Sequence, residues 1–469
     1  MAHYDICVIG AGSGGLSVAA AAAQFGQKVV LFEKGDMGGD CLNTGCVPSK
    51  ALLAASKAAH TFRASHKFGI AKAEPAVDFK AVHDHVHGVI AAIAPLDSVE
   101  RFESLGVKVI KAHAKFTGPA TVEGGGETVT ARRFVIATGS TAATPPIPGL
   151  DTVPYLTNES IFENETLPGH LIIIGGGPIG MEMAQAHRRL GAKVTVLEAF
   201  DPLAKDDPEL TAIVLESLKA DGVDIRARVK ITGMRKTARG VAIDIEGQGT
   251  LEGTHLLVAA GRKPNVDGLG LEAAGIEFTK RSVTVDDGLK TTNRKVYAIG
   301  DVAGGLQFTH VANYHAGLVI RNALFRLPVK NKTDNVPWVT YTDPELAHVG
   351  LTEAEAMKRH GGGVKVLRWH FHENDRAQAE RKTKGLVKAI TGKGGKILGC
   401  SIVGPNAGDL IQPWVLAMTA GLKIKALTDM IVPYPTFGDA SKRAAIGYFA
   451  GLASKPLVRT VIGVLGRLG

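Results

Sequence analysis

Two cysteines with surroundings suited to thiol chemistry lie in residues 38–50, which read GGDCLNTGCVPSK. Cys41 and Cys46 are five positions apart, and such side chains would diverge by about 140° on an undistorted helix. Gly45 can bend the backbone and bring the two sulfurs together. Pro48 suits the first turn of a following helix, whose partial positive charge would favour thiolate over thiol. The pattern predicts a reactive cysteine pair.

The pair by itself leaves other interpretations open. The two cysteines could form a structural disulfide or be two buried thiols, since free cysteine is among the most buried residue types. A metal site would need further Cys or His at ligand spacing, which this segment does not contain. The position of the pair, directly after a dinucleotide-binding pattern, favours redox chemistry.

That pattern covers residues 4–33, with strands expected over 4–9 and 28–32 and a helix over 16–25. Its three turn glycines allow a tight turn, the approach of a pyrophosphate and close packing of the helix on the strand. The acid that ends the second strand would accept hydrogen bonds from a ribose. The turn glycines are Gly10, Gly12 and Gly15, and the acid is Glu33.

The same pattern returns over residues 170–198, with strands expected over 170–174 and 193–197 and a helix over 181–190. The acid follows the first glycine at the same distance in both copies, so we predict two dinucleotide sites. A carboxylate bonds a free 2′-hydroxyl and repels a 2′-phosphate, so the second acid favours NAD(H) over NADP(H); a surface glutamate at a strand end is the alternative. The residues are Gly175, Gly177, Gly180 and Glu198.

The rest of the chain reads as further apolar strands separated by breaks. Residues 134–140, 256–262 and 296–301 are short strands that end at glycine, and the Pro-rich residues 144–149 look like a domain crossing. Alternating strands beyond residue 336 suggest an α+β domain.

Bulk composition describes an ordinary globular protein, with 469 residues, 45% hydrophobic and 21% charged. The net charge of +9 comes without a nucleic-acid-binding module, so we expect no nucleic-acid partner and attribute it to phosphate-bearing cofactors or to no special role. Cys7 and Cys400 lie in apolar strand patterns, and this cysteine usage fits a reducing cytosol. We expect a cytoplasmic protein without signal peptide or membrane span.

Together these motifs resemble the pyridine nucleotide–disulfide oxidoreductase family, the class I flavoprotein disulfide reductases, nearest to dihydrolipoamide dehydrogenase and mercuric-reductase-like members. The resemblance runs essentially end to end. The motifs that carry it are residues 10–33, 41–50, 137–139, 175–198, 260–265, 297–301, 341–345 and 402–411.

The resemblance implies an α/β fold with two Rossmann-like domains and a C-terminal α+β dimerisation domain. The domains it implies are the first part of an FAD-binding domain (1–149), an NAD-binding domain (150–266), the returning part of the FAD-binding domain (267–335) and a dimerisation domain (336–469).

The resemblance also implies FAD in the first site and NAD(H) in the second. The expected FAD contacts are Gly10, Gly12, Ser13, Gly14, Gly15, Glu33, Gly39, Lys50, Ala114, Thr138, Gly139, Asp301 and Thr309. The expected NAD(H) contacts are Gly175, Gly177, Gly180, Glu198 and Gly261. No metal ligands are expected.

By family position, Cys46 is the thiolate next to the flavin and Cys41 the sulfur that exchanges with substrate. Lys50 would sit by flavin N5, paired with Glu182. The protein would be a homodimer in which the C-terminal end of each subunit completes the partner's active site.

One segment departs from the dithiol-handling members, which carry a His-Pro-Thr-x-x-Glu motif near the C-terminus. Here tyrosine replaces the histidine at Tyr434, and aspartate replaces the glutamate at Asp439, so a Tyr–Asp pair is expected in place of the hydrogen-bonded His–Glu pair. A phenol, with a reference pKa near 10 against about 6.5 for imidazole, is a poor proton shuttle at neutral pH.

The departure favours a mercuric-reductase-like enzyme that reduces a disulfide, a metal or another small acceptor with NADH. The alternatives are a dihydrolipoyl dehydrogenase and, from another class, a redox-sensing flavoprotein that acts through a partner.

Two further features invite a binding interpretation. The tail carries Leu457, Val461 and Leu465 at helical spacing among basic residues, which favours packing on the dimer over contact with a membrane surface. His83 and His87 could suggest a metal site, but a solvated helix face is the preferred interpretation.

Overall fold

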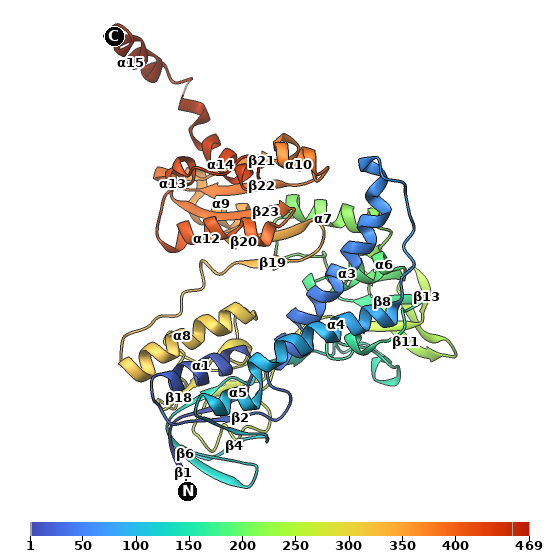
Figure 1. Ribbon diagram of the computed structural model, residues 1–469, viewed down its shortest axis with the longest axis vertical. Coiled ribbons are helices and arrows are strands. Elements are labelled where there is room, and N and C mark those ends of the chain that lie inside the picture. Colours follow the sequence, from blue (N-terminus) through green and yellow to red (C-terminus); the bar gives the residue numbers. More distant parts are fainter. Residues whose placement is uncertain (1, 453, 469) are drawn as a thin grey trace.

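A computed structural model describes residues 2–452 and 454–468 (Figure 1). The first unit is a sheet whose parallel strands run in the order β3-β2-β1-β6, extended by β18 and by an antiparallel pair. Helices α1 (Ser13–Gln24) and α8 (Thr309–Phe325) pack together in one hydrophobic cluster against it. The strands are β1 (Ala2–Ile9), β2 (Val29–Phe32), β3 (Val107–Ile110), β4 (Lys115–Gly118), β5 (Thr121–Gly124), β6 (Glu127–Ile136) and β18 (Val296–Ala298).

The second unit repeats the plan with a parallel sheet in the order β10-β9-β8-β14 and a separate antiparallel sheet of β11, β12 and β13. The long helix α3 (Cys46–Ala64) and helix α4 (Phe79–Ile93) share the hydrophobic core of this unit with β8 and α6. The other elements are β8 (His170–Ile174), α6 (Pro178–Leu190), β9 (Lys193–Leu197), α7 (Pro208–Ala220), β10 (Asp224–Arg226), β11 (Ile231–Thr237), β12 (Gly240–Ile245), β13 (Gly249–Gly253) and β14 (His255–Val258).

The third unit is an antiparallel sheet in the order β19-β20-β23-β22-β21, covered by short helices. Trp414 is fully buried between this sheet and the C-terminal helices. The α/β fold with two Rossmann-like units and a C-terminal α+β unit is confirmed. The elements are β19 (Trp338–Thr340), β20 (Glu345–Gly350), α9 (Glu353–His360), β21 (Lys365–His370), α10 (Asp375–Ala379), β22 (Leu386–Thr391), β23 (Ile397–Gly404), α11 (Ala407–Leu410), α12 (Gln412–Thr419), α13 (Ile424–Asp429) and α14 (Asp439–Ile446).

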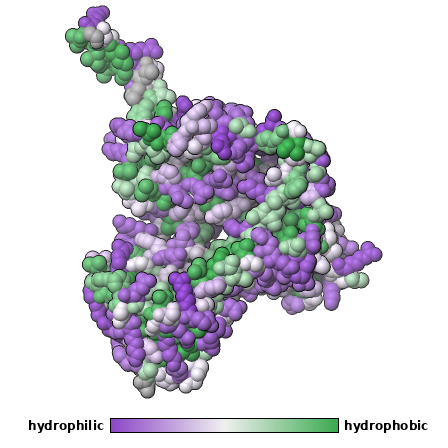
Figure 2. All heavy atoms as spheres, in the orientation of Figure 1, coloured by the Kyte–Doolittle hydropathy of each residue, from purple (hydrophilic) through white to green (hydrophobic). Residues whose placement is uncertain are grey.

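The C-terminal tail leaves the third unit as an arm that ends in helix α15 (Pro456–Leu465), and Figure 1 shows it projecting from the body. Apolar residues gather along the arm in Figure 2, and Leu457, Ile462 and Leu465 are exposed. That these side chains pack on the dimer, and not on a membrane surface, stays a prediction. In the described part of the chain, no helix is both long and apolar enough to cross a bilayer.

Short elements connect these units. They are α2 (Gly39–Asn43), α5 (Val99–Ser104), β7 (Ser140–Ala142), β15 (Arg262–Pro264), β16 (Phe278–Thr279), β17 (Ser282–Val283), and the 3₁₀ turns Ser65–Phe68, Ala94–Asp97, Leu150–Thr152, η4 (Ile161–Glu163), Gly300–Ala303, Gly361–Gly363, Phe371–Glu373, Lys393–Gly395 and Gly447–Leu452.

Candidate active site

The cysteine pair lies across a break between two helices. Cys41 is in the short helix α2, and Cys46 is the first residue of α3. Gly45 between them has a non-helical backbone (φ −126°, ψ −110°), and a Cβ there would lie 2.8 Å from the carbonyl oxygen of Asp40. The predicted bend at Gly45 is therefore present. Both sulfurs are free thiols, with Cys41 half-buried and Cys46 exposed.

The two thiols have opposite acidities because one donates to the other. A hydrogen bond from the Cys41 thiol lowers the pKa of Cys46 to about 6; burial opposes this shift, and Thr309 and the charge of Lys50 add to it. The same hydrogen bond, together with burial and the Cys46 charge, raises the pKa of Cys41 well above its usual range. At neutral pH the reduced pair is therefore a thiolate at Cys46 beside a thiol at Cys41.

Lys50, one turn into α3, reaches across to the second unit. Its Nζ lies 2.8 Å from Oε2 of Glu182, a buried residue of α6. The other carboxylate oxygen of Glu182 accepts a hydrogen bond of 2.9 Å from the backbone N–H of Tyr341, and the Tyr341 ring lies under the ammonium, 4.3 Å from its centroid. The expected Lys50–Glu182 pair is present and joins α3, α6 and the third unit.

Next to the cysteine pair, Asp40 is part of a polar cluster that was not predicted from the sequence. Its carboxylate accepts hydrogen bonds from Asn158 (2.8 Å) and Thr44 (3.0 Å) and forms an ion pair with Arg262 (3.2 Å). Arg262 also lies 3.7 Å from Asp301, so it links two carboxylates of the cavity. Asn158 and Arg262 lie far from Asp40 in the sequence, and only the threonine at i+4 could have been suspected.

A second carboxylate, Asp301, accepts a hydrogen bond of 2.5 Å from Ser140, and burial raises its pKa. Ser140 itself accepts from the Arg262 guanidinium at 2.7 Å. Asp301 is thus held by Ser140 and Arg262 in the wall of the cavity.

The two glycine turns have matching geometry. Gly10 and Gly175 have φ of +105° and +114°, and a Cβ on either would lie 2.5 or 2.4 Å from a backbone carbonyl oxygen. Each terminal acid accepts two backbone hydrogen bonds: Glu33 from Ala11 (2.6 Å) and Gly35 (2.6 Å). The equivalent bonds to Glu198 come from Gly176 (2.5 Å) and Phe200 (2.8 Å).

These cradles fit dinucleotides. The middle glycine of each turn, Gly12 or Gly177, has no heavy atom within 4 Å of where a Cβ would stand, so its backbone faces open space. The third glycines, Gly15 and Gly180, let helix and strand approach so closely that a Cβ would lie 1.9 or 2.0 Å from a carbonyl oxygen. Each helix begins at its turn, so its N-terminal dipole points at the open space.

One continuous cavity joins the glycine turns, the cysteine pair and the Lys50–Glu182 pair. Gly15 and Gly180 pack behind their turns and do not line it. The predicted residues along its wall are Gly10, Gly12, Ser13, Gly14, Glu33, Gly39, Cys41, Cys46, Lys50, Ala114, Thr138, Gly139, Gly175, Gly177, Glu182, Glu198, Gly261, Asp301 and Thr309.

Neither Tyr434 nor Asp439 lines this cavity, and the expected pairing between them is wrong. The hydroxyl of Tyr434, 69% exposed, donates to Oδ2 of Asp375 at 2.5 Å, whereas Asp439 pairs with Arg443 at 3.1 Å. The Asp375 carboxylate raises the pKa of Tyr434 further. Asp375 precedes Tyr434 by 59 residues, so no local pattern could have paired them.

A second expectation needs correction outside the cavity. The histidine stretch was expected to be a solvated helix face, and His85 is exposed as expected. The side chain of His83, however, is only 13% exposed.

The fold and the cavity together define an oxidoreductase with two dinucleotide-binding units and a reactive cysteine pair. The chain belongs to the pyridine nucleotide-disulphide oxidoreductase family, which matches residues 4–316, and its dimerisation domain matches residues 336–445. FAD and a pyridine nucleotide are the cofactors of this family, and the third unit is its dimerisation domain.

Two curated relatives cover nearly the whole chain. The mercuric reductase of Streptomyces lividans is 37% identical over 96% of this chain and 97% of its own. The dihydrolipoyl dehydrogenase of Thermus scotoductus is 36% identical over 95% of this chain and 97% of its own.

Solved structures are similar over the same extent. The HOCl-induced flavoprotein disulfide reductase RclA from Escherichia coli aligns with a TM-score of 0.85 and 28% identity, over 94% of this chain and 99% of its own. LpdA from Mycobacterium tuberculosis aligns with a TM-score of 0.87 and 26% identity, over 95% of this chain and 100% of its own.

Proposed function

We propose that the protein is an NADH-dependent FAD flavoprotein. It passes electrons from the nicotinamide to the Cys41–Cys46 pair and then to a disulfide, a metal ion or another small acceptor. The observation that carries this proposal is the stabilised Cys46 thiolate in the cavity that joins the two glycine turns. An inert structural pair would not need an acidic thiol in an open cavity.

The first glycine turn, with Glu33, would hold the pyrophosphate and ribose of FAD. Asp301 would bind the ribityl chain of FAD. FAD supplies two-electron transfer between nicotinamide and thiols when it is bound. Lys50, held by Glu182, would place a positive charge against the ring system where negative charge develops. Ala114, Thr138, Gly139 and Thr309 would complete this site from the first unit.

Cys41 and Cys46 have different roles in electron transfer. Closing the Cys41–Cys46 disulfide from the thiolate and thiol forms the S–S bond, gives two electrons to the acceptor and releases the one proton of Cys41. NADH returns two electrons and one proton as a hydride, which breaks the S–S bond and restores the thiolate and thiol. By family position, Cys41 is the sulfur that exchanges with the acceptor. Cys46, as the thiolate, holds the negative charge that the reduced pair must carry.

Preference for NADH rests on the second glycine turn. The Glu198 carboxylate is fixed by two backbone N–H groups at the place where an adenosine ribose would bind. The nearby Arg228, which could attract a 2′-phosphate, is engaged by both carboxylate oxygens of Asp201 at 2.9 and 3.1 Å. The 2′-phosphate of NADPH would therefore be repelled by the Glu198 carboxylate, and the Arg228 guanidinium would not be free to bind it.

A metal ion or a small oxidant suits this chain better than a dithiol, because Tyr434 replaces the base that dithiol oxidation needs. The relatives include mercuric reductases, and RclA has been solved as a Cu(II) complex. We propose that Tyr434 reaches the cysteine pair of the partner subunit in a homodimer. Dihydrolipoyl dehydrogenase is the second candidate, supported by relatives at 35–36% identity.

Steady-state assays of the FAD-loaded protein with NADH test these proposals. The acceptors are Hg(II), Cu(II), lipoamide, glutathione disulfide, quinones and oxygen. We expect rapid NADH oxidation with a metal ion or small oxidant, slow turnover of lipoamide, and loss of the metal- or disulfide-dependent rate in Cys46→Ser. Lipoamide turnover that exceeds every other acceptor would assign the second candidate, and a Cys46→Ser variant as fast as the parent would refute the cysteine mechanism.

A further inference from the structure

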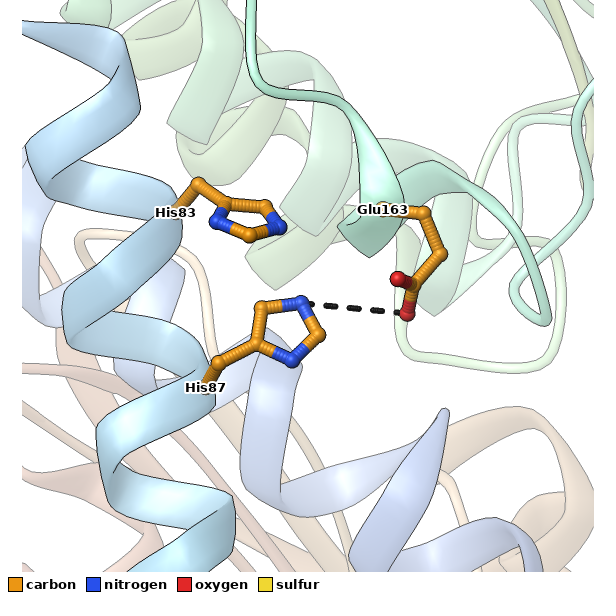
Figure 3. A group of neighbouring side chains, drawn as sticks. All are labelled: His83, His87 and Glu163. Carbon is orange, nitrogen blue, oxygen red and sulfur yellow. Dashed lines mark ion pairs between the residues drawn. The ribbon is translucent and has the colours of Figure 1, made fainter.

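Three potential ligand groups meet outside the cavity, where α4 of the first part of the chain faces the turn η4. His83 and His87 are four residues apart on α4, and their rings lie on one face with centroids 4.2 Å apart. Glu163, the last residue of η4, brings its carboxylate to the same place. One ligand atom from each residue lies within 4.8 Å of the other two (Figure 3).

The orientation of His83 is that of a metal ligand with an outer partner. Its Nδ1 lies 3.1 Å from Oδ1 of Asp84, which fixes the ring and leaves Nε2 free. In Figure 3 the free nitrogen points toward Glu163 and the space above His87. Histidines that bind metals usually engage their other ring nitrogen with a carboxylate or carbonyl in this way.

The ring of His87 also points its Nε2 into the cluster. This nitrogen lies 3.7 Å from Oε1 of Glu163 and 3.2 Å from the carbonyl oxygen of Phe162. Imidazole nitrogens and oxygens about 3.4 Å apart are the spacing of a tetrahedral zinc site with bonds of about 2.0–2.1 Å. The Glu163 side chain is 62% exposed, so it can rotate to close the remaining gap.

We propose that His83, His87 and Glu163 bind a divalent transition-metal ion of the zinc class, with water or the Phe162 carbonyl in the fourth position. Nitrogen ligands select such an ion over Mg²⁺ or Ca²⁺, which prefer all-oxygen sites. The neighbouring cation Lys80 does not compete, because it pairs with Asp84 and lies 3.5 Å from Glu165. Bound metal would fasten α4 to the segment that leads into the second unit.

The test is zinc binding by the full-length, untagged, FAD-loaded protein. Because the cysteine pair could itself bind metal, the parent for the measurement carries Cys41→Ser and Cys46→Ser. We expect calorimetry to show one Zn²⁺ per chain at this site and no heat with Mg²⁺. His83→Ala with His87→Ala should abolish that binding, and Glu163→Gln or Asp84→Asn should weaken it about tenfold or more. His85→Ala, an exposed histidine on the same helix, should leave it unchanged.

Two measurements keep the result interpretable if a variant folds poorly. Zn²⁺ should raise the melting temperature of the parent but not of the milder His87→Gln variant, because only a ligand of the folded state stabilises it. Cu²⁺ bound to the parent should give an electron paramagnetic resonance spectrum with coupling to two imidazole nitrogens. Absence of zinc binding in the parent, or equal binding after both histidines are replaced, would overturn the proposal.

Discussion

The sulfur of Cys46 lies 3.5 Å from the hydroxyl oxygen of Thr309, and each residue begins a helix. Cys46 starts α3 and Thr309 starts α8, so two helix N-termini, each with partial positive charge, converge on one sulfur. Thr309 lies 263 positions further along the chain, so its contribution to the acidity of this thiol depends on the fold, whereas the larger contribution from Cys41 is local in the sequence.

The first prediction concerns pH. The pKa of Cys46 is lowered from its usual value to about 6, so the thiolate is present above pH 6 and is lost as the pH falls through that value. The long-wavelength thiolate-to-flavin absorbance of the reduced protein should therefore decline with a midpoint near pH 6. Thr309→Val should move the midpoint upward because it removes a hydrogen bond to the thiolate.

Cys46→Ser is the control for this titration, and it should remove the band at every pH. A band that survives this replacement would assign the thiolate to another sulfur. A midpoint near the ordinary value for cysteine would show that the surroundings of Cys46 do not stabilise its charge.

The second prediction concerns the pair of Lys50 and Glu182. Lys50→Met leaves a buried carboxylate without its cation, so we expect a loss of about 1–3 kcal/mol in the free energy of unfolding. Glu182→Gln should cost less, because the amide oxygen can still accept from the Tyr341 N–H and half-exposed Lys50 can turn to water. Urea unfolding of the FAD-loaded protein measures both.

Lys57→Met is the matched control, since Lys57 is an exposed lysine of the same helix. Its replacement should change the free energy of unfolding by about 0.5 kcal/mol or less. Equal losses of unfolding free energy in the Lys50 and Lys57 variants would mean that the Lys50–Glu182 ion pair does not stabilise the fold.

The third prediction concerns the nucleotide. Glu198→Gln removes the negative charge and keeps one acceptor oxygen, which can serve Gly176 or Phe200 but not both, so the ratio of kcat/KM for NADH over NADPH should fall about tenfold. Glu198→Val should narrow the preference as well, with weaker binding of both nucleotides. Steady-state kinetics with both cofactors give the ratio.

Asp201→Asn tests whether Arg228 also contributes to the preference for NADH over NADPH. It weakens the hold on Arg228, so the guanidinium becomes available to a 2′-phosphate and KM for NADPH should fall while KM for NADH stays constant. An unaltered ratio in both Glu198 variants would place the discrimination elsewhere in the cavity.

The regular elements near the glycine turns were predictable because each has a strong local signal. The strands expected over 170–174 and 193–197 coincide with β8 and β9. The helices begin earlier than expected, at Ser13 and Pro178, because the last residues of each glycine turn already form the first helical turn. A glycine is a weak helix former, so its sequence signal was that of a loop.

Contacts between distant segments were not predictable from one sequence. The packing of α3 and α4 into the core of the second unit depends on which surface the long helix meets. The carboxylate partner of Tyr434 was expected to be Asp439 but is Asp375 of α10 instead. Family position did bring Lys50 and Glu182 together correctly, because that pairing was carried over from relatives as a whole.

The last prediction uses the corrected partner of Tyr434. Tyr434→His places an imidazole within reach of Asp375, which can orient it as a base, so lipoamide turnover should rise about tenfold or more. Adding Asp375→Asn should cancel the gain, whereas adding Asp439→Asn should not, because Asp439 pairs with Arg443. A gain that depends on Asp439 would restore the pairing expected from the motif, and no gain in any variant would show that another group moves the proton.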